Sequence, residues 1–300
     1  LRIMDDIVKA GATEASAPVP LVAGAGARPV MPAARSLPIQ HCRLRRSVLE
    51  SPTVWLPPFF GTRCVTHSLD SLVEGLDTRV LFQARWGYKQ GKRSNAEYAE
   101  HLRKEAQPAF DATIAAARRE NLFQIRGVYG FYRCRTAGNE LMIVDETGNT
   151  EALFAFPRQA HESGLCVADF FSGIREDVII LWAATVGPRV AETEAALMKA
   201  RKYREYLHIH GLGVELAERA AAATASLAVK ELAGQAVPPR ALRFSFGFPA
   251  CPNLTSQRDV LRLLQADRIG ISLTETCQMV PELSVSGFQT LHPQARYFQP

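Results

Sequence analysis

One segment of the 300-residue chain combines residue types that bind small ligands, RFSFGFPACP at Arg243–Pro252. Arg243 interrupts an otherwise apolar, strand-like run, and its planar guanidinium can hold a carboxylate through two parallel hydrogen bonds. Gly247 lets the backbone approach a ligand closely, and Pro249 and Pro252 stiffen the bend. The alternative is a structural turn that carries Arg243 on the solvent face of an edge strand.

Two glutamates and two histidines carry weaker signals. Glu215 and Glu218 are three residues apart, so a helix places them on one side, where they can meet a ligand ammonium or a ribose hydroxyl, or face solvent. His208 and His210 are two residues apart, so on a helix their rings diverge, and no third ligand is close in sequence. We expect no metal site and interpret both histidines as favourable near a helix C-terminus.

Cys251 is the cysteine that falls within the Arg243–Pro252 segment. No histidine lies close to it in the sequence, and proline flanks it, so we interpret it as a small packed side chain and not as a nucleophile. No Ser/His/Asp, Cys/His or phosphate-binding glycine pattern emerges elsewhere. We therefore expect this chain to supply no catalytic residue.

Short strands and a few helices must position these residues. Ser94 and Glu97 form a capping box that predicts a helix up to Glu120, disturbed at Pro108. Glycine–asparagine pairs at 138–139 and 148–149 predict two hairpins. Strands are expected at 127–134, 140–145, 153–156, 165–171, 178–185, 242–246, 271–275 and 283–291.

Helical patterns cover 191–207, 214–233 and 256–266, and Gly211 and Gly213 are expected to break the first from the second. Strands and helices do not alternate strictly, and no repeat is present. We therefore predict an α+β fold with a twisted, mostly antiparallel sheet and helices packed to one side.

The composition excludes several classes of protein. Lys and Arg number 35 against 30 Asp and Glu, and this net charge of +5 is too small and too evenly mixed to indicate nucleic-acid binding. The longest apolar run is far shorter than the ~20 residues of a membrane span. The 6 cysteines lack the spacing of a disulfide framework or a zinc ribbon. We expect a cytoplasmic protein that binds neither nucleic acid nor membrane.

Residues 1–50 differ from the rest of the chain. After a helix end at 1–9, alanine and proline predominate up to Pro38, which predicts an extended linker. The pattern GAGARP at Gly24–Pro29 lacks the preceding strand and following helix that a dinucleotide site needs. We place the globular domain at 51–300.

Eight ordered segments carry a family resemblance. They are PPFFGTR (57–63), RWGY (85–88), FPRQ (156–159), LCVADFF (165–171), HGLGVELAE (210–218), RFSFGFPACPNL (243–254), LTETCQMVPELSVSG (273–287) and LHPQARYF (291–298). Together they resemble the C-terminal activation domain of cobalamin-dependent methionine synthase, from about Pro57 to Phe298. The most specific motif is Arg-x-x-x-Gly-aromatic-Pro-x-Cys-Pro.

The resemblance implies a curved α+β domain around a twisted antiparallel sheet, with S-adenosylmethionine bound in a shallow groove. It also implies a role in methionine biosynthesis, the reactivation of cobalamin that has oxidised to cob(II)alamin. A flavodoxin-type partner would supply one electron, and S-adenosylmethionine a methyl group. The cobalamin would be held by the cobalamin-binding domain of methionine synthase and not by this chain.

The resemblance also assigns site residues one by one. Arg243 matches the arginine that holds the ligand carboxylate, and Glu218 matches a glutamate in the groove. Gly247, Phe248 and Ala250 match the loop whose backbone lies against the nucleoside, with Phe248 where many members have tyrosine.

Three positions depart from the family pattern. Glu215 stands where some members carry arginine, and Gln289 stands where some carry tyrosine. Trp55 stands where some members place an aspartate towards the ligand amino group. These departures leave the amino-group contact open, together with the possibility of a docking module that has lost ligand binding.

The chain lacks other parts of the enzyme it resembles. No cobalamin-binding histidine motif, adjacent-cysteine zinc site or barrel-sized folate region is present, so we expect no methionine synthesis by this chain alone. It would be a module of the 5-methyltetrahydrofolate–homocysteine methyltransferase, an interpretation that the Leu1 start favours. The alternative is a free-standing reactivation subunit of a split corrinoid methyltransferase. An independent methyltransferase would need a glycine-rich strand–turn–helix, which is absent.

Overall fold

A computed structural model describes residues 51, 53–160, 164–234 and 241–298, so the predicted linker at 1–50 lies outside the described residues. Seven strands in this part of the chain form one sheet, in the order β4-β3-β2-β5-β9-β6, with β1 also paired to β2. Every pairing is antiparallel, which confirms the predicted sheet. The strands are β1 (Gly61–Thr66), β2 (Arg126–Ala137), β3 (Glu140–Val144), β4 (Thr150–Ala155), β5 (Asp177–Thr185), β6 (Leu242–Phe244) and β9 (Ser284–Thr290).

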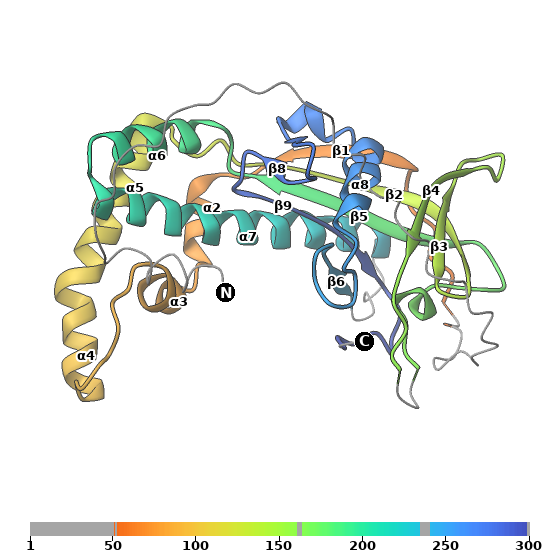
Figure 1. The fold of residues 1–300 in the computed structure, drawn as a ribbon, viewed down its shortest axis with the longest axis horizontal. Helices are drawn as coiled ribbons and strands as arrows, with labels where there is room; N and C mark the ends of the chain where they lie inside the picture. The colour runs from red at the N-terminus through yellow and green to blue at the C-terminus, as the bar shows by residue number, and fades with distance from the viewer. Residues whose placement is uncertain (1–50, 52, 161–163, 235–240, 299–300) are drawn as a thin grey trace, which may run out of the picture. The chain divides into compact units, whose positions relative to one another are not determined.

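The long strand β2 organises this sheet (Figure 1). One of its edges pairs with β5 from Arg126 to Cys134, and the other pairs first with β1 and then with β3. Both predicted hairpin turns are confirmed, because Gly138 and Gly148 adopt φ of +61° and +86°, which residues with a Cβ rarely adopt. A separate two-stranded sheet joins β7 (Ser272–Leu273) to β8 (Met279–Val280).

The helices of the described residues vary widely in length. They are α2 (Leu69–Glu74), α3 (Thr78–Val80), α4 (Asn95–His101), α5 (Gln107–Glu120), α6 (Arg189–Lys199), α7 (Tyr203–Ala233) and α8 (Gln257–Leu264), with π-helical turns at Leu81–Arg85 and Leu102–Ala106 and 3₁₀ turns at Val167–Phe170, Leu254–Ser256 and Ala266–Ile269. Ser94 and Glu97 form the predicted capping box. The predicted disturbance at Pro108 takes the form of the π-turn just before it, where the helix accommodates a residue without an N–H. None of these helices is long and apolar enough to cross a membrane.

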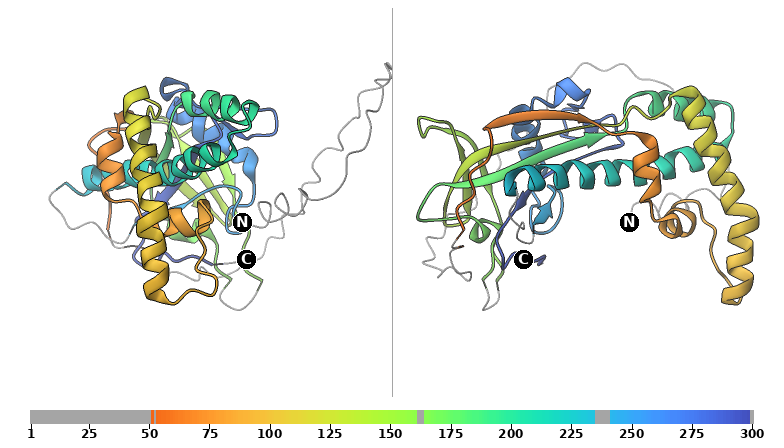
Figure 2. Two further views of the ribbon diagram at one scale, coloured as in Figure 1. Left: turned by 90° about the vertical axis from the view of Figure 1, so that its left-hand side faces the viewer. Right: turned by 180° about the vertical axis from the view of Figure 1, so that it is seen from behind.

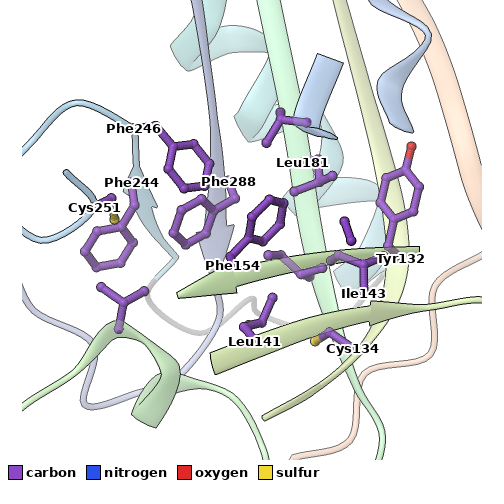
Figure 3. Packing of buried hydrophobic residues seen from close by; sticks show 14 of the residues in the cluster. Tyr132, Cys134, Leu141, Ile143, Phe154, Leu181, Phe244, Phe246, Cys251 and Phe288 are labelled. Carbon is purple, nitrogen blue, oxygen red and sulfur yellow. The ribbon is translucent and has the colours of Figure 1, made fainter. Parts of the chain in front are cut away.

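Both faces of the sheet are covered, as Figures 1 and 2 show. On β5, Ile180, Trp182 and Ala184 face the core with α5, α6 and α7, whereas Ile179 and Leu181 face the core with α8. Figure 3 shows part of the second core, in which phenylalanines from β4, β6 and β9 meet. The prediction that helices pack to one side therefore holds for α5–α7, and α8 is the exception. The continuous apolar run of β5 is explained by burial on both faces.

The predicted strand at 165–171 is wrong. This segment forms a 3₁₀ turn at Val167–Phe170, and its Asp169 is buried. The Asp169 carboxylate accepts hydrogen bonds from the Arg158 guanidinium at 2.7 and 2.9 Å and from the backbone N–H of Cys166. A buried carboxylate needs several such donors, and a turn brings the Cys166 N–H within its reach.

The predicted break at Gly211 and Gly213 is also wrong, because α7 runs unbroken from Tyr203 to Ala233. A Cβ on Gly211 would lie 2.8 Å from Arg85 Cβ and 2.9 Å from Trp86 Cδ1. A Cβ on Gly213 would lie 2.5 Å from Leu283 Cδ1. The two glycines allow neighbouring segments to pack closely on the helix instead of ending it.

We therefore expect Gly211→Ala to destabilise the fold, although helix propensity alone favours alanine by about 1 kcal/mol. The clash should give a net loss of about 1–3 kcal/mol in the free energy of unfolding, measured by urea denaturation. Ser226→Ala, at an exposed position of α7, is the control and should be neutral or slightly stabilising. Stabilisation by both variants would show that the close contact imposes no constraint.

His210 connects α7 to α6 through an ion pair. Its Nδ1 lies 3.1 Å from Glu194 Oε1, both side chains are largely buried, and Tyr206 stacks on the ring. The hydrogen bond to Glu194 raises the pKa of His210 above its ordinary value. Because the folded-state pKa is the higher one, the ion pair stabilises the fold below about pH 6.5 and loses this effect as the pH rises through the folded-state pKa.

Accordingly, His210→Gln should lose more stability at pH 5.5 than at pH 8.5, measured by urea denaturation at both pH values. Glu194→Gln should show the same pH dependence, and the double variant should lose no further pH-dependent stability. If the deficit of His210→Gln were equal at both pH values, the ion pair would not contribute.

Candidate functional site

A cavity of about 710 Å³ lies where the edge strand β6 ends. Its walls come from β5, β6, the loop after β6, α7, α8, the β8–β9 segment and the last described residues. The residues that line it are Trp182, Glu218, Arg243, Phe244, Ser245, Phe246, Phe248, Pro249, Ala250, Cys251, Gln257, Met279, Ser284, Val285, Ser286, Tyr297 and Phe298. This volume lies in the range of small-molecule sites.

The local sequence explains why the sheet edge is open here. β6 pairs with only Phe288–Thr290 of β9, so among the described residues the earlier part of β9 has no partner strand on that edge. The chain then turns at Gly247, whose φ of +91° suits glycine. Two backbone hydrogen bonds close the turn, from Gly247 N to Cys251 O and from Cys251 N to Phe248 O, both 2.8 Å. The turn leaves Phe248 65% exposed at the cavity rim.

Arg243 supplies a cation to this cavity. Leu242 and Phe244 on either side of it are buried, so the arginine points to the opposite face of β6, towards α7. The Arg243 Cζ lies 5.7 Å from the centre of the Trp182 ring, and Tyr297 Oη donates to the Arg243 carbonyl at 2.7 Å. No carboxylate of the described residues forms an ion pair with the Arg243 guanidinium. Its two-donor fork is therefore available to a ligand.

The other predicted residues divide into two groups. Phe248, Ala250 and Glu218 line the cavity with Arg243, and Gly247 forms the turn beside it. Glu215 and Gln289 do not line it.

Glu215 faces away from the cavity, where its Oε1 accepts a hydrogen bond from Arg85 Nε at 2.8 Å. Gln289 is the cross-strand neighbour of Arg243, but its buried Nε2 donates to the Ala225 carbonyl of α7 at 2.9 Å. Trp55 packs against the core on the α7 side and is also absent from the cavity wall. Gln289 therefore sits beneath the site and connects it to α7.

Several cavity residues were not predicted as site residues. Tyr297 and Phe298 belong to a segment that carries the family resemblance, so that segment was the available signal. Ser286 Oγ donates to Gln257 Oε1 at 3.2 Å across β9 and α8, a long-range contact with no local sequence pattern. Trp182 lies in an apolar strand whose pattern predicts only burial.

The arrangement is suited to binding a small ligand. One guanidinium, one carboxylate and several aromatic faces suit a zwitterionic ligand with a flat ring. Burial raises the pKa of the Cys251 thiol to about 12, so the thiolate that a nucleophile needs is scarce near neutral pH. No group of three or more His, Cys, Asp or Glu residues suited to a metal ion occurs in the described ranges.

The chain is similar to known proteins over most of its length. The family model described as vitamin B12 dependent methionine synthase, activation domain, matches residues 68–300. Methionine synthase of Mycobacterium tuberculosis is 31% identical over 85% of this chain, and that of Mycobacterium leprae is 30% identical over 81%. These alignments cover 24% and 23% of the two relatives, so the chain spans about a quarter of their length.

The fold is similar to that of a solved structure. The crystal structure of the MetH reactivation domain bound to AdoHcy superposes with a TM-score of 0.73 at 24% sequence identity. The match covers 82% of this chain and 83% of that chain. It therefore supports the predicted fold class over nearly the whole described region.

We expect iodoacetamide at pH 8 to alkylate Cys64 much faster than Cys251 in the native protein. Cys64 is exposed, whereas Cys251 is buried with a thiol pKa near 12. The Cys251 thiol is almost wholly protonated at this pH, and burial adds a barrier of access, so a rate ratio above about 100 is expected by peptide mass spectrometry. The two should react alike in urea. Equal rates in the native protein would identify Cys251 as a reactive thiol.

Proposed function

The chain belongs to the family of vitamin B12-dependent methionine synthase activation domains, and we propose that it binds S-adenosylmethionine in the cavity beside Arg243. The observation that carries this proposal is the unpaired Arg243 guanidinium in a cavity with aromatic walls. The similar MetH reactivation domain was solved with AdoHcy, which has the same amino-acid and adenosine parts.

Different cavity residues would contact different parts of the ligand. Arg243 binds the carboxylate through two parallel hydrogen bonds. Glu218, the carboxylate in the cavity wall, accepts hydrogen bonds from the ammonium or from the ribose hydroxyls. The exposed faces of Phe248 and Tyr297 lie at the rim, where an adenine ring can pack against them, and the backbone of 247–250 approaches the nucleoside.

Two departures from the family pattern do not remove a wall of this cavity. Trp55 and Gln289 both lie outside its lining residues, and the residues that line it retain a cation, a carboxylate and aromatic rings. This observation favours a module that binds its ligand over one that has lost it. We therefore assign the contact with the ligand ammonium to Glu218 and not to Trp55.

In the reaction, the bound S-adenosylmethionine supplies the methyl group for the reductive methylation of cob(II)alamin to methylcobalamin, as part of methionine biosynthesis in the cytoplasm. Arg243 and the loop at 247–250 orient the ligand, and the open rim allows a cobalamin-binding domain to approach it. We propose that this domain belongs to the same enzyme, because the similar methionine synthases are about four times as long as the matched region. The electron would come from a flavodoxin-type donor.

We expect Arg243→Ala to weaken binding of S-adenosylmethionine by about 2–4 kcal/mol, or roughly 30- to 1,000-fold, in calorimetric titration. Arg243→Lys keeps the charge but loses the planar fork, so it should recover only part of this loss. Decarboxylated S-adenosylmethionine should bind the unmodified protein weakly and discriminate little between it and Arg243→Ala.

The matched control is Arg135→Ala, which removes an exposed arginine of β2 that does not line the cavity. Its affinity should equal that of the unmodified protein. Equal affinities of the unmodified protein and Arg243→Ala for S-adenosylmethionine would place the site elsewhere. Absence of binding by the unmodified protein would instead favour a docking module without a ligand.

A further inference from the structure

Trp182 leaves a polar atom without a partner in the wall of the cavity. The residue is 1% exposed, and its indole Nε1 forms no hydrogen bond with any described residue. Buried indole N–H groups are normally hydrogen-bonded, so an unpaired one beside a ligand cavity calls for an acceptor. We infer that the Trp182 Nε1–H donates a hydrogen bond to the ligand carboxylate that Arg243 holds.

The packing of the indole orients its polar edge. A Cβ on Gly287 would lie 2.8 Å from Trp182 Cζ2 and 3.0 Å from Ser245 Oγ. Cζ2 and Nε1 are bonded to the same ring carbon, so this edge of the indole lies towards β9 and the start of the loop after β6. Ser245 and Val285, on these two segments, line the cavity. Gly287 thus leaves room for the indole edge beside the cavity.

The position of Arg243 selects the acceptor. Its Cζ lies 5.7 Å from the Trp182 ring centre, so a carboxylate bound to the guanidinium lies next to the same indole. An indole N–H only donates, and its strongest partner is an anionic oxygen. None of the acceptors of the described wall, Ser245, Ser284, Ser286 and Glu218 included, hydrogen-bonds to the indole N–H. Arg243 and Trp182 then form a two-residue carboxylate site.

This contact rests on the proposed function, and the test separates the two. Trp182→Phe keeps a ring in the wall and removes only the N–H and part of the ring edge. S-adenosylhomocysteine should bind this variant about 10- to 150-fold more weakly than the unmodified protein, the range of a charge-assisted hydrogen bond. 5′-Methylthioadenosine, which lacks the amino-acid part, should bind both within about 2-fold, because the group that the indole contacts is missing.

A direct readout is the indole ¹H–¹⁵N resonance of the unmodified protein, assigned by its loss in Trp182→Phe. It should move downfield when S-adenosylhomocysteine is added and stay in place with 5′-methylthioadenosine. The matched control is Trp86→Phe, because Trp86 Nε1 already donates to the His208 carbonyl at 3.1 Å, away from the cavity. Its affinity for S-adenosylhomocysteine should be unchanged.

Each other outcome overturns the inference. Equal affinity of Trp182→Phe and the unmodified protein for S-adenosylhomocysteine would mean that the N–H binds a buried water or nothing. Weaker binding without a shift of the indole resonance, or an equal loss with both ligands, would indicate a change in cavity shape instead of a hydrogen bond. In these cases the loss of affinity in Arg243→Ala still supports the proposed function. If Arg243→Ala also binds like the unmodified protein, the proposed site itself is wrong.

Discussion

The antiparallel pairing of β2 with β5, and of β5 with β9, is the interaction on which the rest of the structure depends. β2 and β5 pair along nine successive positions, from Arg126–Thr185 to Cys134–Asp177. Successive side chains of these strands point to opposite faces, so the same ladder builds the core under α7 and the core under α8. β9 extends this ladder to the edge, where the shorter β6 leaves part of it uncovered. The cavity is a consequence of this mismatch in strand length.

Helix α7 connects this sheet to the cavity. It contacts β2, β5 and β9 along its length, and small residues let it lie close to its neighbours. Gly127 of β2 illustrates this, since a Cβ there would lie 2.1 Å from Thr224 Oγ1. One helix therefore fixes Glu218 in the cavity wall and accepts, at the Ala225 carbonyl, the hydrogen bond of Gln289 beneath Arg243. A shift of α7 would move both charged groups of the cavity.

Features of the fold and the cavity that depend on a local sequence pattern were predictable from the sequence. Features that depend on packing between distant parts of the chain were not. The sheet, both hairpins and the grouping of Arg243 with Phe248 and Ala250 follow from periodicity, turn residues and one contiguous motif. The predicted helix break at Gly211 and Gly213 was wrong because a glycine that ends a helix and a glycine that allows close packing look alike in sequence. The contacts that distinguish them come from Arg85 and Leu283, which are distant in the chain. The apolar run around Asp169 predicted a strand. The segment forms a turn instead, because the turn brings hydrogen-bond donors to the buried Asp169 carboxylate. β1 and the helices between residues 69 and 85 gave no distinct pattern.

Trp55 and Gln289, which depart from the family pattern, both lie outside the cavity wall. Position 55 packs into the α7-side core, where a tryptophan contributes a large apolar area that an aspartate could not. Gln289 forms a buried hydrogen bond that connects β9 to α7 directly opposite Arg243. Neither side chain lines the cavity. In the complex that we propose, recognition of the ligand would concentrate on the residues of the wall, with the carboxylate facing Arg243 and the indole of Trp182, and the amino group facing Glu218.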